Sequence, residues 1–172
     1  MPLYVNFSSF ELPKNSVLLK KKLIEIIIFL KKNKIRFIEI SYPRISNIEN
    51  FFFDKFKEYR IIFDFNEINT LDELKNCIKI SQKFKSNLIR IKFSNNLEFK
   101  RDPKKIFEKK FSNFIFILKS IKDFIKKNNF YIAIENHQDI DSHDFEKIFK
   151  QVKSSNIGMC FDIANSIATC EL

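Results

Sequence analysis

Two neighbouring stretches decide the fold: FYIAIENHQD at residues 130–139 and NIGMCFDIAN at residues 156–165. Each contains an apolar run that ends in an acid, since Ile132–Ile134 leads to Glu135 and Met159–Phe161 leads to Asp162. A short apolar run of this kind is typical of a parallel strand that is buried on both faces. The stretches therefore predict two strands of an α/β fold whose C-terminal ends carry polar side chains.

Side chains alternate along a strand, and this alternation places the polar residues of each stretch on one face. The residues that share this face are Ala133, Glu135 and His137 in the first stretch, and Gly158, Cys160 and Asp162 in the second. Small residues below a carboxylate suit the inward face of a closed barrel, in which the chemistry lies at the C-terminal strand ends. Two carboxylates and an imidazole at that end could hold a divalent metal ion.

The rest of the chain repeats the alternation of strand and helix. Further strands are predicted at residues 3–8, 36–42, 60–65 and 88–94. Helices are predicted at residues 15–32, 48–59, 70–85 and 102–127, and another begins near Asp141 or Ser142. Strands in strict alternation with helices indicate a parallel sheet. The predicted fold class is α/β, an incomplete (β/α)8 TIM barrel with about six parallel strands.

The chain has 172 residues, which is too few for a complete barrel. A full (β/α)8 barrel has about 250 residues, and six strand–helix units already account for most of this sequence. No low-complexity linker divides it, so residues 1–172 are predicted to form a single domain that lacks the last two units. We expect a frameshifted or split gene product or an incomplete record. The exposed edges of an open sheet favour aggregation, a homo-oligomer or a complementing fragment.

Local signals predict where three helices begin or end. The first helix is expected to be capped at Asn15 or the next residue, and to end at Asn33 in the left-handed conformation. The segment Thr70–Glu73 fits a capping box, in which the two side chains satisfy free backbone N–H groups. Asp102–Pro103 suits the start of a long helix, for which we expect a break near Lys110.

Composition indicates a globular protein. The hydrophobic fraction is 45% and the formal net charge is +10. The lysines are spread over many helical faces without an Arg-rich tract or a nucleic-acid motif, so nucleic acid is not an expected partner.

Three cysteines, Cys77, Cys160 and Cys170, make no disulfide framework, which favours a reducing, cytoplasmic setting. The first residues do not fit a signal peptide, no segment suits a membrane span, and no membrane partner is expected.

The motifs IENHQD and GMCFDIAN resemble the sugar phosphate isomerase/epimerase family. Its members are TIM barrels related to xylose isomerases and, more distantly, to endonuclease IV. The resemblance is specific over residues 132–171 and looser upstream. It implies a divalent-metal isomerase or epimerase that acts on a sugar, a sugar phosphate or a similar polyol carbonyl compound. The metal could be Mn²⁺, Mg²⁺, Co²⁺ or Zn²⁺.

The resemblance also implies roles for two acids one strand–helix unit apart. Glu135 and Asp162 match two of the family's four metal ligands, and Glu135 would also act as the acid or base beside the substrate. A metal that holds the substrate's oxygens stabilises an enediolate while the carboxylate moves the proton. The remaining ligands of the family, a His and a second Glu, come from two further strands. The site is therefore expected to be half built.

Five residues are candidates for substrate binding: His137, Asn136, Asn165, Glu39 and Arg90. His137 could instead bind the metal, and Asn136 could equally be a loop-forming residue. Glu39 and Arg90 could form structural salt bridges. Asn165 stands where tagatose epimerases and endonuclease IV carry a His in a D-x-x-H pattern. That departure weakens the comparison with endonuclease IV, which needs a richer zinc site.

Three functions are open on these grounds. The leading one is a metal-dependent sugar (phosphate) isomerase or epimerase that works through an enediolate. The second is a noncatalytic remnant or binding protein of the same fold, and the third is an endonuclease IV-like DNA repair nuclease. Glu135 and Asp162 could instead have a purely structural role. In that case the two acids would be buried and would form ion pairs with Arg90 and Lys92.

Overall fold

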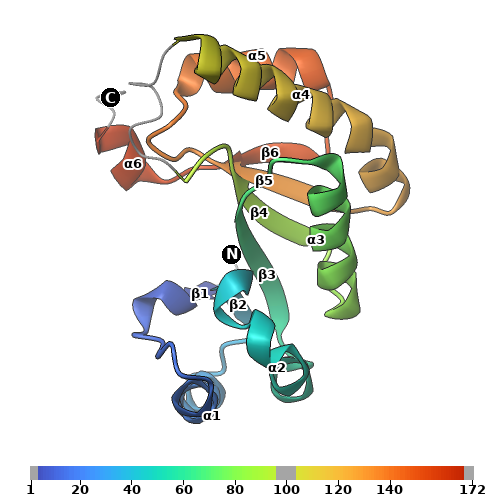
Figure 1. Cartoon of the computed structure of the whole chain (residues 1–172). Helices are drawn as coiled ribbons and strands as arrows, with labels where there is room; N and C mark the ends of the chain where they lie inside the picture. Colours follow the sequence, from blue (N-terminus) through green and yellow to red (C-terminus); the bar gives the residue numbers. More distant parts are fainter. Residues whose placement is uncertain (1–3, 96–103, 169–172) are drawn as a thin grey trace. The chain divides into compact units, whose positions relative to one another are not determined.

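The computed structural model describes residues 4–95 and 104–168. Six strands alternate with helices along the chain, and the strand pairs within each part are parallel (Figure 1). This confirms the predicted fold class, an incomplete α/β TIM barrel. The chain groups into two compact units, Met1–Asp64 with Ile80–Ser86, and Phe65–Lys79 with Asn87–Leu172. A single domain over residues 1–172 stays a prediction.

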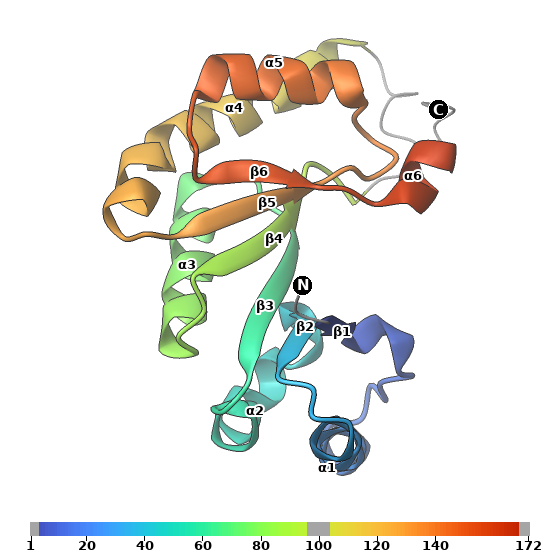
Figure 2. The same cartoon turned by 180° about the vertical axis from the view of Figure 1, so that it is seen from behind.

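The first unit contains three strands and two helices. Its strands are β1 (Tyr4–Asn6), β2 (Phe37–Ser41) and most of β3 (Arg60–Glu67). Its helices are α1 (Ser16–Lys32) and α2 (Glu49–Phe56), with 3-10 turns η1 (Phe7–Ser9), η2 (Tyr42–Arg44) and η3 (Ser46–Ile48). Figure 2 shows α1 and α2 beside these strands. Ile38 lies opposite Val5 on one side and Ile61 on the other.

Aromatic packing holds the first unit together. Phe52 and Phe56 stack at 4.3 Å on the inner face of α2. Phe63 of β3 meets Phe52 at 6.4 Å and Phe84 at 4.9 Å. Buried aromatic pairs of this geometry add stabilisation beyond their buried area.

The end of α1 differs from the prediction by one residue. Asn15 caps the helix as expected, because its side-chain oxygen accepts from the N–H groups of Val17 and Leu18. Asn33 has φ −94°, so the left-handed conformation predicted there is wrong. Asn33 instead continues the last turn, since its side chain and backbone N–H both donate to the carbonyl of Phe29. The chain reverses at Lys34, where φ is 55°.

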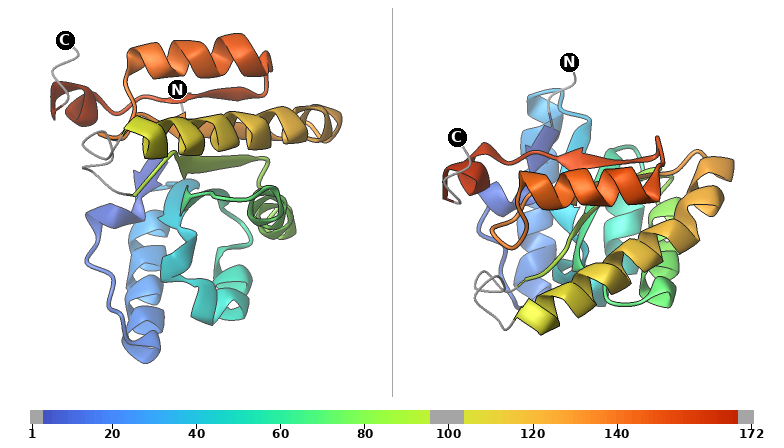
Figure 3. Two further views of the ribbon diagram at one scale, coloured as in Figure 1. Left: turned by 45° about the horizontal axis from the view of Figure 1, so that its top comes forward. Right: turned by 90° about the horizontal axis from the view of Figure 1, so that it is seen from above.

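The second unit contains the strands that the opening motifs predict. They are β4 (Leu88–Lys92), β5 (Tyr131–Glu135) and β6 (Ile157–Cys160). Its helices are α4 (Lys104–Lys127), α5 (Ser142–Val152), α6 (Ile163–Ala168) and the first part of α3 (Leu71–Lys83). The strands are in parallel register, with Ile132 between Ile89 and Ile157. Figure 3 shows α4 and α5 side by side over these strands.

Two predicted helix signals in the second unit have clear outcomes. The capping box before α3 is confirmed, because Glu73 N–H donates to Thr70 Oγ1 at 3.1 Å and Thr70 N–H donates to Glu73 Oε2 at 3.2 Å. The break near Lys110 is wrong, since α4 runs without interruption. Apolar residues continue at helical spacing through that point, and Phe111 packs on Phe93 at 5.8 Å. The predicted start at Asp102–Pro103 lies outside the described residues.

The last strand is less buried than predicted. Met159 is 39% exposed, Phe161 just beyond β6 is 62% exposed, and Cys160 is only partly buried. In the part of the chain that the structure describes, β5 is the partner of β6 and the other edge of β6 is uncovered. The apolar run therefore predicted the strand correctly and its burial wrongly.

Candidate active site

Strand register brings Lys92 and Glu135 to the same level of the second unit. Arg90 lies opposite Ala133 in the parallel pair, and Ala133 lies opposite Gly158. Lys92 and Glu135 are each two residues further along their strands, so they share a face with Arg90. The space beside Gly158 is open, since a Cβ added there would meet nothing within 4 Å. The small residues Ala133 and Gly158 thus leave space beside the charged residues, on the side of the N-terminal strand ends.

Glu135 is a buried carboxylate held between two cations. One of its oxygens, Oε2, lies 3.2 Å from Arg90 Nη1 and 3.5 Å from Lys92 Nζ. The Glu135 side chain is only 5% exposed, and those of Arg90 and Lys92 are 16% and 17% exposed. Neither contact to Oε2 has hydrogen-bond geometry. The structural ion pairs considered for Glu135 are therefore present.

His137 lies two residues beyond the end of β5. Its backbone N–H donates to the Glu135 backbone carbonyl at 2.9 Å. Its Nδ1 is buried and makes no hydrogen bond within the described chain. Burial lowers the pKa of the imidazole and Lys92 lowers it further, while Glu135 and Asp162 act in the opposite direction. The net shift is downward, so His137 is neutral at pH 7.

Asn136 fixes the turn that follows β6. Its amide donates to the Asp162 carbonyl and to Ser166 Oγ, both at 2.9 Å. The Asp162 N–H in turn donates to the Asn136 side-chain oxygen. Asn136 is 3% exposed, so the described contacts satisfy a buried amide. This is the loop-forming alternative for Asn136, and substrate contact by this residue stays a prediction.

The carboxylate of Asp162 is oriented by the first turn of α6. Oδ1 accepts from the Ala164 N–H at 2.9 Å, and Oδ2 accepts from the Asn165 amide at 3.2 Å. Asn165 therefore contacts one of the predicted metal ligands. Its proposed contact with substrate stays a prediction.

The first unit contains the predicted site residue Glu39. Its Oε1 accepts a hydrogen bond from the Asn6 amide at 3.2 Å, across the β1–β2 pair. Asp64 is buried in the same unit. The sequence placed both acids at strand ends, but Glu39 is the middle residue of β2 and β3 continues for three residues beyond Asp64, so that placement is wrong.

A second charged cluster lies at the C-terminal ends of β3 and β4. Lys110 Nζ lies 2.5 Å from Glu67 Oε1, and Ser94 contacts both side chains.

Asp139, in the loop after β5, is fully buried, and neither carboxylate oxygen has a partner of good geometry among the described residues. Burial raises the pKa of Asp139 to about 6, and backbone amides limit the rise.

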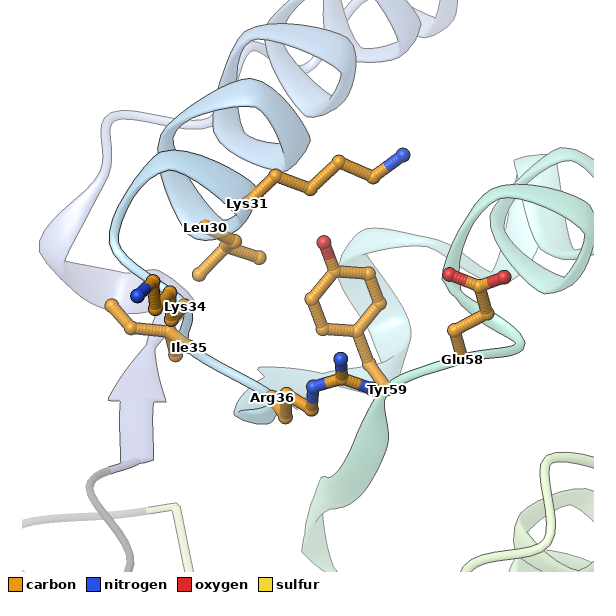
Figure 4. A pocket seen from close by; sticks show the side chains of 7 residues that line it. All are labelled: Leu30, Lys31, Lys34, Ile35, Arg36, Glu58 and Tyr59. Atoms are coloured by element: carbon orange, nitrogen blue, oxygen red, sulfur yellow. The ribbon is translucent and has the colours of Figure 1, made fainter.

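A hollow of about 430 Å³ lies in the first unit, away from the strand ends that carry the acids (Figure 4). Arg36 precedes β2, and Glu58 and Tyr59 precede β3, so this hollow is at the N-terminal ends of the strands. In α/β barrels the chemistry lies at the other end. The hollow is therefore not the candidate active site.

The donor chemistry fits two positions of a divalent-metal site. Glu135 and Asp162 offer carboxylate oxygens, which suit Mg²⁺, Mn²⁺ and Zn²⁺, and Glu135 Oε2 is buried without a hydrogen bond. Among the residues described, no group of three or more His, Cys, Asp or Glu side chains could hold a metal ion. Arg90 and Lys92 also compete for Oε2. Metal binding by the two acids stays a prediction.

The sequence indicated most of this cluster, with Lys92 only as an ion-pair partner of the acids, and it passed over Ser166. The signal for Lys92 was present, because alternation along residues 88–94 puts it on the face of Arg90. Ser166 follows Asp162 at helical spacing, yet nothing in the sequence indicates a bond to Asn136. Asp139 gave no signal, since an acid in a loop is ordinarily exposed.

Comparison with known families identifies the fold family. The family model for the xylose isomerase-like TIM barrel matches residues 64–171, which is more than half of the chain. No curated protein matches. No helix in the described part has the length and apolar character needed to cross a membrane.

Several solved structures share the fold. A D-psicose 3-epimerase crystallised in the presence of D-fructose superposes with a TM-score of 0.73 at 13% identity, covering 98% of this chain and 65% of its own. D-psicose 3-epimerase from Clostridium cellulolyticum H10 with D-tagatose gives 0.67 at 10% identity, covering 97% and 65%. N-acetylneuraminate lyase from Mycoplasma synoviae gives 0.53 at 15% identity, covering 88% and 52%. The chain thus spans 65% of the length of the epimerases that it matches.

Proposed function

This chain belongs to the xylose isomerase-like TIM-barrel family, and on that premise we propose that it is a sugar isomerase or epimerase. The substrate would be a carbonyl sugar or its phosphate, and the reaction a proton transfer through an enediolate. The similarity of fold to D-psicose 3-epimerases supports this class of reaction. The observation that carries the proposal is the buried Glu135 carboxylate at the end of β5, surrounded by His137, Arg90 and Lys92.

Glu135 is the proposed base. It would take the proton from the carbon beside the substrate's carbonyl. In an isomerisation a proton returns to the neighbouring carbon, and in an epimerisation it returns to the opposite face of the same carbon. Arg90 lies 3.2 Å from its carboxylate and can hold it in position for the proton transfer. His137 is neutral at pH 7, so its imidazole can donate to or accept from a substrate hydroxyl.

A divalent ion is the proposed cofactor, with Glu135 and Asp162 as its ligands from this chain. Such an ion supplies charge stabilisation to the enediolate when it is bound. Asp162 suits this role because Ala164 and Asn165 hold its carboxylate in place. The ion would compete with Arg90 and Lys92 for Glu135, and we therefore expect weak binding.

The remaining candidates are assigned to the substrate side. Arg90, Asn165, Asn136 and Glu39 are proposed to lie within reach of the sugar, as the resemblance implies. We also propose a cytoplasmic location. The buried thiol of Cys77 is in keeping with it, because burial raises its pKa to about 12 and leaves the thiol unreactive.

A second candidate function is a noncatalytic protein of the same fold. The ion pairs of Glu135 with Arg90 and Lys92 favour it, because a carboxylate used for structure needs no substrate. A noncatalytic protein could still bind a sugar, but it would not change one.

Product formation separates the two. The chain is incubated with a panel of ketoses, aldoses and their phosphates, with and without Mn²⁺, and products are read by NMR. Wild-type protein is expected to convert at least one member of the panel and Glu135→Gln none. Glu146→Gln, which removes an exposed acid on α5, is the matched control and should act as wild type. Conversion of no compound would favour the noncatalytic protein.

A further inference from the structure

We propose that Lys92 is a catalytic residue of this site, whose ammonium group binds the substrate's carbonyl oxygen and stabilises the negative charge that develops there. For its chemistry the inference rests on the proposed function. It adds a residue that neither the family resemblance nor the sequence motifs assign.

The position of Lys92 suits this role. It is the last residue of β4, at the C-terminal strand end where barrel enzymes carry their chemistry. Its ammonium nitrogen lies 3.5 Å from Glu135 Oε2, so the cation and the proposed base are neighbours. A carbonyl oxygen and the proton on the next carbon are also neighbours within a substrate. A group that binds the oxygen must therefore lie close to the group that takes the proton.

Lys92 also has the hydrogen-bonding capacity for a ligand. An ammonium group has three donors, and within the described chain its ion-pair partner is Glu135 alone. That contact is longer than the 3.2 Å between Arg90 and the same oxygen. Arg90 can thus keep Glu135 in place while Lys92 turns to the substrate. The Lys92 side chain is 17% exposed, so water screens its charge only in part.

His137 adds a second group beside the same carboxylate. Its backbone N–H donates to the Glu135 carbonyl at 2.9 Å, and its buried Nδ1 has no hydrogen-bond partner among the described residues. A substrate bound at Glu135 would meet a base, an imidazole and a cation together.

The proposed step is balanced. The bond between hydrogen and the carbon beside the carbonyl breaks, and the proton goes to the Glu135 carboxylate. The electron pair of that bond forms the carbon–carbon double bond, and the carbonyl π pair moves onto oxygen. Lys92 donates a hydrogen bond to this oxyanion. The proton then returns to the former carbonyl carbon, and the hydroxyl proton of the neighbouring carbon passes to the oxyanion. The neighbouring carbon becomes the new carbonyl and the oxyanion a hydroxyl, so no oxidant or reductant is needed.

Binding of an enediolate mimic tests the role of Lys92 without turnover. Glycolate is the probe, because its planar carboxylate and adjacent hydroxyl resemble an enediolate. The full chain is treated with a chelating resin and titrated while the two histidines are followed by proton NMR. The His137 signal is expected to shift and saturate. The signal of His143, which is exposed on α5, should stay in place.

Variants assign the binding to Lys92. Lys92→Met should weaken glycolate binding by about tenfold or more, the effect of losing one charge-assisted hydrogen bond. Lys92→Arg should stay within a few-fold of wild type. Lys126→Met, which removes an exposed lysine in the last turn of α4, is the control and should bind normally. Thermal melting confirms that each variant is folded, and Lys92→Gln replaces Lys92→Met if the latter does not fold.

Glu135→Gln separates this inference from the proposed function. The amide resembles Glu135 after it has taken the proton, so this variant should bind glycolate at least as tightly as wild type while it forms no product. Equal binding by Lys92→Met and wild type, or no binding by wild type, would overturn the role of Lys92 even if turnover is found. Lys92-dependent binding without any turnover would leave the oxyanion site standing and overturn the proposed enzyme.

Discussion

Asn136 and Asp162 are joined by two hydrogen bonds that run in opposite directions. The Asn136 amide donates to the Asp162 carbonyl at 2.9 Å, and the Asp162 N–H donates back to the amide oxygen. A residue at the end of β5 therefore fixes the backbone after β6. The pair thereby fixes the backbone from which the Asp162 carboxylate projects.

Asn136→Ala should destabilise the second unit. The change leaves the Asp162 N–H without its acceptor and removes the bond to Ser166, so the expected loss is about 2 kcal/mol of unfolding free energy. Urea denaturation measures it. Asn128→Ala, which removes a bond at the exposed end of α4, should cost less than about 1 kcal/mol. Equal losses in the two variants would contradict the buried role of Asn136.

Glu135→Gln should lower stability as well as activity. The amide leaves Arg90 and Lys92 without their buried counter-charge, and breaking a buried ion pair from one side costs about 3 kcal/mol or more. Glu135→Asp keeps the charge on a shorter side chain and should lose less. If Glu135→Gln melts at the wild-type temperature, the three charges do not form the buried cluster described above.

Asp139 should make stability depend on pH. Burial raises its folded-state pKa to about 6 from an ordinary value of 3.8, so folding favours the protonated acid. The contribution is present in full below pH 3.8 and is lost as pH rises through 6, a change of up to about 3 kcal/mol. Asp139→Asn should therefore be more stable than wild type at pH 7, and the gain should shrink toward pH 4.

Urea denaturation at several pH values checks the sign for Asp139. The difference between variant and wild type isolates this acid, because Glu67, whose pKa is lowered, acts in the opposite direction in both proteins. A constant difference from pH 4 to pH 7 would show that Asp139 does not titrate abnormally.

The uncovered apolar surface after β6 should make the chain self-associate. Met159, Phe161, Ile163 and Ile167 are between 39% and 62% exposed. Edge strands are commonly protected by charged residues, yet residues 154–172 contain no Lys or Arg. Light scattering should show a mass that rises with concentration, and Phe161→Lys should lower it. Phe124→Lys, at an exposed position on α4, is the matched control. A monodisperse wild-type monomer would contradict this prediction.

The fold was readable from the sequence because local signals and periodicity agree. The runs before Glu135 and Asp162 became parallel strands, and the cap at Asn15 and the box at Thr70 and Glu73 are present. The prediction failed at Asn33, which can either adopt the left-handed conformation or hydrogen-bond back to the helix. Its side chain donates to the Phe29 carbonyl, and the chain reverses one residue later than predicted.

The sequence indicated which residues belong to the candidate site, but not the contacts among them. Alternation along β4 and β5 places Arg90, Lys92 and Glu135 on one face, but the distances among them follow from the register of two strands. The contact of Asn136 with Ser166 spans 30 positions, and no local pattern indicates it. The burial of Asp139 depends on packing in the same way.

The most direct test of the central claim is solvent-hydrogen exchange in D₂O. D-fructose or a ketohexose phosphate is incubated with the full chain, with and without Mn²⁺, and proton NMR follows the hydrogen on the carbon beside the carbonyl. We predict loss of that signal with wild-type protein, none with Glu135→Gln, and a rate lower by about 100-fold with Lys92→Met. Exchange by Glu135→Gln at the wild-type rate, or no exchange by wild type with any sugar, would contradict the assignment of Glu135 as the base.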